Sequence, residues 1–282
     1  MEIVSTVRSW RALTTIDDPA ARTAAWTDDY EAAHPSVFEA YYSAWGDRSR
    51  REAAALEAPG LVDQVMAAEV RATGLLTRAE RDFRARGLLG PDDLHVVLLV
   101  GGRSSNGWVV EHDGHRSLFL ALEFLGSPPY DDLLVVHELA HVAQGGLSPA
   151  ARDRTYPTFL ATVIEGAATA TSRALRPGQS DSAYLWMDEG HHEWVEQCRA
   201  AADLIAAMLL EQLDTPDDAE AVASLLRNRS RGEIPPRAAY WVGDQVARDF
   251  LDEGRDLRDL LAIHPGEARE RVHAWATRQA HD

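Results

Sequence analysis

One five-residue pattern, His137-Glu138-Leu139-Ala140-His141, constrains this chain of 282 residues more than any other feature. On an α-helix, residues four apart lie one above the other, so both imidazoles can face one metal ion. Glu138 lies about 100° around the helix from His137 and can reach a water on that ion without binding the ion itself. The pattern therefore predicts a zinc-binding helix with His137 and His141 as ligands and Glu138 as general base.

The residues around this pattern are apolar, which predicts a helix that is buried on nearly all sides. Burying two imidazoles and a carboxylate costs free energy unless a partner compensates for the lost hydration, and a metal ion is such a partner. The alternative is an ordinary amphipathic helix with partly exposed histidines. The apolar neighbours, which favour the metal site over this alternative, are Leu133, Leu134, Val135, Val136, Leu139, Ala140, Val142 and Ala143.

A catalytic zinc ion needs a third protein ligand and an open position for water. The best candidate is Glu165, a lone acid in the apolar helix predicted for residues 158–175. The chain between His141 and Glu165 is long enough for a loop and an antiparallel helix, and Gly166 and Ala167 leave space for close approach to the motif helix. The alternatives for Glu165 are an acid at a helix end or the partner of an arginine. Gln144 and Leu147 stand where a longer metzincin motif would continue, so the third ligand is predicted to be this glutamate.

Composition and charge exclude several classes of function. The net charge of −17 repels phosphate backbones, so we expect no nucleic-acid partner. All basic side chains are arginines, which excludes Schiff-base chemistry and a phosphate-loop lysine. A single cysteine, Cys198, excludes an internal disulfide framework and a four-thiolate zinc site. The sequence has no long uncharged apolar run and no secretion signal at its start, so we expect no membrane span and a cytoplasmic location.

Hydrophobic patterns predict an α+β, mainly α protein that forms a single domain over residues 1–282. The predicted parts are N-terminal helices in residues 1–92, a small antiparallel sheet in residues 93–130 and a helical catalytic part in residues 131–282. Strands are predicted at residues 94–100, 108–110 and 117–124, the last as the cleft edge on which an extended peptide adds as a strand. Helices are predicted at residues 63–86, 131–146, 158–175, 189–213, 218–227, 238–253 and 266–280.

The motif helix, Glu165-Gly166 and the block Ile-Pro-Pro-Arg-Ala-Ala-Tyr-Trp-Val-Gly at residues 234–243 resemble a gluzincin-type bacterial family of predicted zinc-dependent proteases. The likeness covers most of the chain beyond residue 60. It implies a zincin-like, thermolysin-like core in which His137, His141 and Glu165 bind the metal and Glu138 is the base. Two features depart from the pattern: Ala167-Ala168 replaces a frequent Leu-Ala, and the Gly-x-Met-x-Asn signature of aminopeptidases is absent.

These observations predict a zinc metallopeptidase that cleaves a peptide or protein substrate with a metal-activated water. Two alternatives remain. One is a zinc hydrolase of a non-peptide amide, and the other is a zinc-stabilised binding module without turnover. A module of this kind would not need Glu138 as a base. A second donor to the oxyanion would be Tyr240, next to Arg237 in the C-terminal block. An equally weighted alternative makes Tyr240 and Trp241 core aromatic residues.

A second histidine cluster lies in residues 188–193, Asp-Glu-Gly-His-His-Glu. His191 and His192 could form a second metal site or supply a donor to the catalytic cleft. The favoured interpretation is a hydrated helix start, since acidic residues are stabilised near helix N-termini.

Overall fold

The computed structural model describes residues 1–91, 94–153 and 155–280, and the chain forms two compact units. The first unit comprises Met1–Ala85 and Leu89–Val142, and the second comprises Arg86–Leu88 and Ala143–Asp282. The predicted boundary between helices and sheet, at residues 92 and 93, lies outside the described residues. Among the described helices, none has the length and apolarity needed to cross a bilayer.

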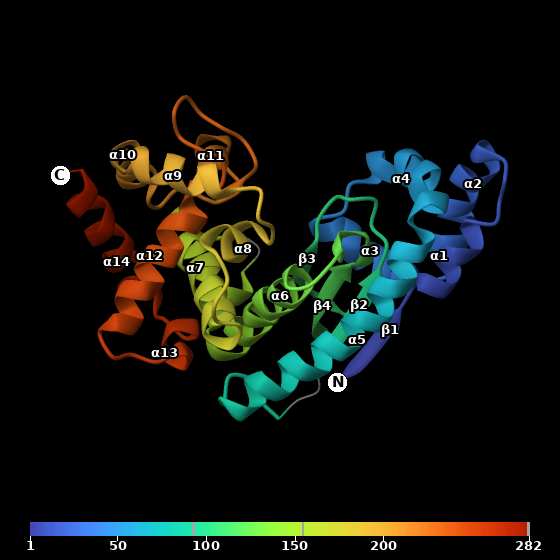
Figure 1. Ribbon diagram of the computed structural model, residues 1–282, viewed down its shortest axis with the longest axis horizontal. Helices are drawn as coiled ribbons and strands as arrows, with labels where there is room; N and C mark the ends of the chain where they lie inside the picture. Colours follow the sequence, from blue (N-terminus) through green and yellow to red (C-terminus); the bar gives the residue numbers. More distant parts are fainter. Residues whose placement is uncertain (92–93, 154, 281–282) are drawn as a thin grey trace. The chain divides into compact units, whose positions relative to one another are not determined.

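The first unit contains a four-stranded mixed sheet with the order β1-β2-β4-β3 (Figure 1). Its strands are β1 (Glu2–Ser5), β2 (His95–Leu99), β3 (Gly107–His112) and β4 (His115–Ala121). β1 pairs parallel with β2, β2 pairs parallel with β4, and only the β3–β4 pair is antiparallel. The expected α+β, mainly helical class is confirmed, but the expected small antiparallel sheet is wrong because β4 inserts between β2 and β3.

Strand β1 was not expected, because the predicted N-terminal part was helical throughout. Only four residues form it, and they gain their backbone partners from a strand some ninety positions away: Ile3 lies opposite Val96 and Val4 opposite Val97. A run this short has no detectable period of its own. Its β structure therefore depends on non-local pairing that local sequence patterns do not report.

The β3–β4 hairpin turns at Asp113 and Gly114, between the paired residues His112 and His115. Asp113 and Gly114 both have positive φ, 50° and 79°, as a two-residue type I′ turn requires. The hairpin places β3 at the edge of the sheet and gives β4 a neighbour on each side. The expectation that residues 117–124 form the edge strand is therefore wrong, since the edge strands of this sheet are β1 and β3.

Helices make up most of the remaining described chain. In the first unit they are α1 (Val7–Leu13), α2 (Pro19–Ala25), α3 (Pro35–Ala44), α4 (Arg51–Glu57) and α5 (Val62–Ala85), and α6 (Tyr130–Leu147) continues into the second. The second unit adds α7 (Thr158–Leu175), α8 (Asp181–Trp186), α9 (His192–Ala200), α10 (Ala202–Gln212), α11 (Ala223–Leu226), α12 (Ala238–Asp252), α13 (Leu257–Leu261) and α14 (Pro265–Gln279). The helix predicted at residues 158–175 is confirmed in full. The one predicted at residues 189–213 is two helices that meet at Ala201, and the short α8 and α13 were not predicted.

A buried carboxyl group holds the loop that leads from β2 to β3. Glu123, two residues after the end of β4, is 2% exposed, and its Oε1 accepts hydrogen bonds from the backbone N–H of Gly101 (2.8 Å) and Arg103 (3.0 Å). Burial raises the pKa of the Glu123 carboxyl, and these N–H donors oppose the shift. Glu123 thus ties together the chain segments that follow two parallel neighbouring strands.

Because the folded pKa of Glu123 is raised, its contribution to stability is present below the ordinary carboxyl pKa and is lost as the pH rises through the raised value. We expect Glu123→Gln to remove this component. The free energy of unfolding, measured in urea at pH 5 and pH 8, should then fall less with rising pH in the variant than in the wild-type protein. Equal pH dependence in the two proteins would contradict the burial argument.

In the second unit, α7 and α12 touch backbone to backbone. A Cβ atom on Gly166 would lie 2.1 Å from the carbonyl oxygen of Gly243, and one on Gly243 would lie 2.1 Å from that of Thr162. Real Cβ atoms do not approach backbone so closely, so both positions require glycine. Gly166 was expected to admit the motif helix, and this expectation is wrong because the space it leaves is filled by α12.

We expect Gly243→Ala to lower the free energy of unfolding by about 3 kcal/mol, because the added methyl group must push two helices apart. Gly74→Ala is the matched control. Gly74 lies inside α5 with nothing within 4 Å of an added Cβ, so alanine should stabilise the protein by about 0.5–1 kcal/mol. Urea unfolding curves of both variants measure the difference, and similar effects would refute the close contact.

Candidate metal centre

Helix α6 carries the histidine motif, and α5 anchors its first turn. Asp131 and Asp132 in that turn form ion pairs with Arg71 (3.0 Å) and Arg78 (2.5 Å) of α5. Their negative charges at the N-terminus of α6 also interact favourably with the helix dipole. The apolar side chains around the motif are buried, apart from the half-buried Val142, so the prediction of a helix covered on nearly all sides is confirmed.

The two motif histidines converge on one side of α6. His137 is 6% exposed and His141 is half-buried. Their ring centroids lie 4.9 Å apart and their planes are nearly perpendicular, at 84°. Side chains four residues apart on a helix adopt this arrangement when both turn toward one point.

Glu165 lies on α7 in the second unit, where the last turns of α6 contact α7. The helix is unbroken to Leu147, and in the second unit the side-chain amide of Gln144 donates a hydrogen bond to the carbonyl oxygen of Ile164 on α7 (2.8 Å). One ligand atom from each of His137, His141 and Glu165 lies within 4.8 Å of the other two. Glu165 is in the middle of α7, so the alternative of an acid at a helix end does not apply.

The donor set fits a zinc ion. Nitrogen and oxygen ligands lie about 2.0–2.2 Å from zinc, hence about 3.4 Å from one another in a tetrahedral site. Small rotations of side chains bring donors within 4.8 Å of one another to that spacing. Two imidazoles and one carboxylate also leave a fourth position for water. Among residues 1–91, 94–153 and 155–280, this is the one group of three or more acidic, histidine or cysteine side chains with such spacing.

Glu138, next to His137, is 6% exposed and lies against the first residue of β3. A Cβ on Gly107 would lie 2.6 Å from Cγ and 2.7 Å from Cδ of Glu138, so a side chain at position 107 would displace this carboxyl group. Both residues belong to the first unit. Sequence patterns did not reveal this role of Gly107, and a glycine at a strand start is the one signal that pointed to close approach.

The two aromatic residues of the C-terminal block have different environments. Trp241 is 7% exposed and packs edge-on against Trp275, with centroids 5.6 Å apart, so it is a core residue. Tyr240 is half-buried, and the guanidinium carbon of Arg237 lies 4.0 Å from its ring centroid. The interpretation as a core aromatic residue is therefore confirmed for Trp241. Tyr240 is only half-buried, and its role as a donor to the oxyanion stays a prediction.

The second histidine cluster engages its own acids. His191 Nδ1 lies 2.7 Å from Asp188 Oδ1, and His192 Nε2 lies 3.1 Å from Glu189 Oε2. His191 also stacks on Trp186, with centroids 4.0 Å apart and planes 4° apart. His192 is the first residue of α9, and Glu189 and His192 are exposed, as expected for a hydrated helix start.

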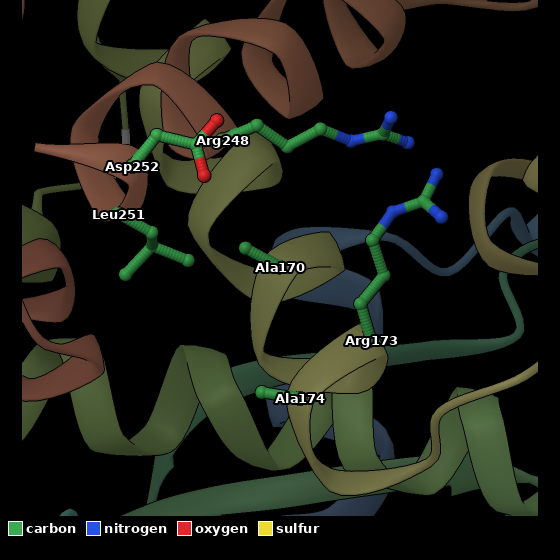
Figure 2. A pocket seen from close by; sticks show the side chains of 6 residues that line it. All are labelled: Ala170, Arg173, Ala174, Arg248, Leu251 and Asp252. Carbon is green, nitrogen blue, oxygen red and sulfur yellow. The ribbon is translucent and has the colours of Figure 1, made fainter. Parts of the chain in front are cut away.

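A cavity of about 380 Å³ lies between α7 and α12 (Figure 2). The residues that line it belong neither to the candidate metal centre nor to the second histidine cluster. Arg173 and Arg248 extend from its wall to the same side, as Figure 2 shows. Both contact Asp244, which is fully buried, at 2.8 and 2.7 Å, and both contact Asp181, at 2.8 and 3.0 Å. Their charges are compensated within the protein, so we assign them to the stability of the second unit.

Comparison with known proteins gives no relative: no protein-family model, curated protein or solved structure matches this chain. The chemistry of the site therefore rests on its own residues.

We expect the protein to bind one zinc ion per chain and Glu165→Gln to weaken that binding by more than about 100-fold, because losing a ligand exceeds the loss caused by outer-shell changes. Competition with a chromogenic chelator measures the dissociation constant. Glu189→Gln, an exposed acid beside His192, is the control and should leave it unchanged. Equal affinities in both variants would exclude Glu165 as a ligand.

Proposed function

We propose that this protein is a zinc-dependent peptidase with a zincin-like core. The observation that carries the proposal is the convergence of His137, His141 and Glu165, with Glu138 adjacent to His137 on the same helix. A structural zinc site is closed by protein ligands and has no use for a neighbouring carboxylate, whereas a hydrolytic site needs both an open position and a base.

His137, His141 and Glu165 would hold the metal, which when bound supplies Lewis-acid polarisation of a carbonyl group and lowers the pKa of a water molecule. Glu138 accepts the proton of that water at a carboxylate oxygen and later donates it to the leaving nitrogen. The absence of a side chain on Gly107 leaves the space that this carboxylate occupies. Tyr240 is the proposed additional donor to the developing oxyanion.

The edge strand β3 is the proposed binding surface for an extended peptide. Ala121 N–H donates to the carbonyl oxygen of Asn106 (3.0 Å), and antiparallel alternation then turns the peptide groups of Gly107, Val109 and Glu111 away from β4. A substrate that added as a strand along this edge would begin at Gly107, the residue against Glu138. The scissile bond and the base would thereby be brought together.

Glu138→Gln should abolish hydrolysis of casein and of a quenched-fluorescence peptide library while zinc binding is retained. The reason is that the amide keeps the size of the side chain but cannot accept the proton. We expect kcat to fall by at least about 100-fold, the lower end of general-base contributions. Full turnover in Glu138→Gln would refute the mechanism, and zinc-loaded wild-type protein without activity on any peptide would refute the peptidase.

Gly107→Ala provides an independent variant of the same step, because the methyl group displaces Glu138 without changing its chemistry. Its kcat should also fall, with zinc affinity unchanged. Gly126→Ala, where an added Cβ meets nothing within 4 Å, serves as its control. Equal activity in the two alanine variants would show that the contact between Gly107 and Glu138 does not matter.

A further inference from the structure

Arg237 is held between two aromatic rings. Its guanidinium carbon lies 4.0 Å from the ring centroid of Tyr240 and 4.5 Å from that of Trp186. Trp186 is backed on its own ring by His191, in a stacked contact with centroids 4.0 Å apart. Stacking on its faces leaves the edge of the guanidinium plane, which carries its five N–H donors, as the part available to an acceptor.

Within the part of the chain that the structure describes, the Arg237 side chain has no hydrogen bond and no ion pair. The nearby acids are engaged elsewhere, Asp188 with His191 and Glu189 with Ser180 (3.0 Å) and His192. A half-buried charge without a counter-ion is costly. Arg237 therefore differs from Arg173 and Arg248, which are paired with aspartates.

The backbone of Arg237 is also unusual. It has φ 60° and ψ 26°, in the left-handed region, where a residue other than glycine is strained. Glycine would relieve the strain at this position but could not present a guanidinium group. Strained residues of this kind concentrate at functional sites, so the strain supports a role for the side chain rather than for the backbone.

Within the second unit, helix α12 connects Arg237 to the surroundings of Glu165. Arg237 caps α12, Tyr240 lies one turn further on, and Gly243 lies against Thr162 and Gly166, which flank Glu165 on α7. Six residues of helix, from Arg237 to Gly243, span about 9 Å. Two or three residues of an extended peptide, at about 3.3 Å each, cover the same length.

We propose that Arg237 binds a carboxylate group of the substrate, so that the protein acts on peptides with a free carboxyl group within two or three residues of the cleaved bond. This inference rests on the proposed peptidase function. Planar, bidentate recognition by arginine suits a carboxylate. The carboxylate is either the C-terminus of the peptide or the side chain of an Asp or Glu residue.

Binding to the zinc-loaded Glu138→Gln protein tests the proposal without turnover. Isothermal titration compares N-acetyl-Leu-Leu with its C-terminal amide, and N-acetyl-Leu-Asp-Leu-amide with the Asn peptide. We expect the acid of one pair to bind at least about 10-fold more tightly, the size of one charge-assisted contact. The pair that shows the preference identifies the source of the carboxylate. Equal binding of acid and amide in both pairs would overturn the proposal.

Arg237→Gly, added to the same protein, should bring the acid-to-amide ratio close to one, and ethylguanidinium in the buffer should restore part of it. Arg229→Gly is the control for charge: Arg229 forms an exposed ion pair with Glu220 (2.7 Å), and its loss should leave the ratio as it was. A purely structural role of Arg237 predicts that acid and amide weaken equally, and that result would overturn the proposal.

Turnover by the wild-type chain separates this inference from the peptidase assignment. If peptides are cleaved without any preference for a carboxylate, the Arg237 proposal fails and the peptidase stands. If no peptide is cleaved although carboxylate binding depends on Arg237, the peptidase fails and the binding site stands.

Discussion

The burial of polar groups in one apolar helix is the constraint on which the candidate site depends. Helix α6 is covered on nearly every side, and it still carries two imidazoles and a carboxylate in consecutive turns. Such groups must find partners inside the protein. Glu165 from α7 offers a ligand atom within 4.8 Å of those of the two imidazoles, and Gly107 at the start of β3 leaves room for the carboxyl group of Glu138.

Local sequence patterns predicted much of this arrangement. The long helices α5, α7 and α12 have helical periodicity, α6 is an apolar segment too long for a strand, and the spacing of His137 and His141 depends only on helix geometry. Glu165 could be selected because a lone acid in an apolar helix calls for a partner. These features share one property, since each is determined within a single element.

The features that the sequence did not reveal depend on contacts between elements. Strand β1 exists through pairing with β2, and the edge position of β3 follows from the insertion of β4. Gly166 was correctly recognised as a site of close approach but was assigned to the wrong neighbour, because a missing side chain does not indicate which helix fills the space. The stacking of Arg237 between Tyr240 and Trp186 likewise joins two separate helical segments.

The glycine contact between α7 and α12 has a mechanical consequence. With no side chain between the two backbones, neither helix can roll or slide against the other without a collision. Helices α7 and α12 therefore move as one rigid body. Glu165 lies one residue before Gly166 on α7, and Tyr240 lies one turn before Gly243 on α12. Thermal motion of the second unit will displace both side chains together and preserve the spacing between them.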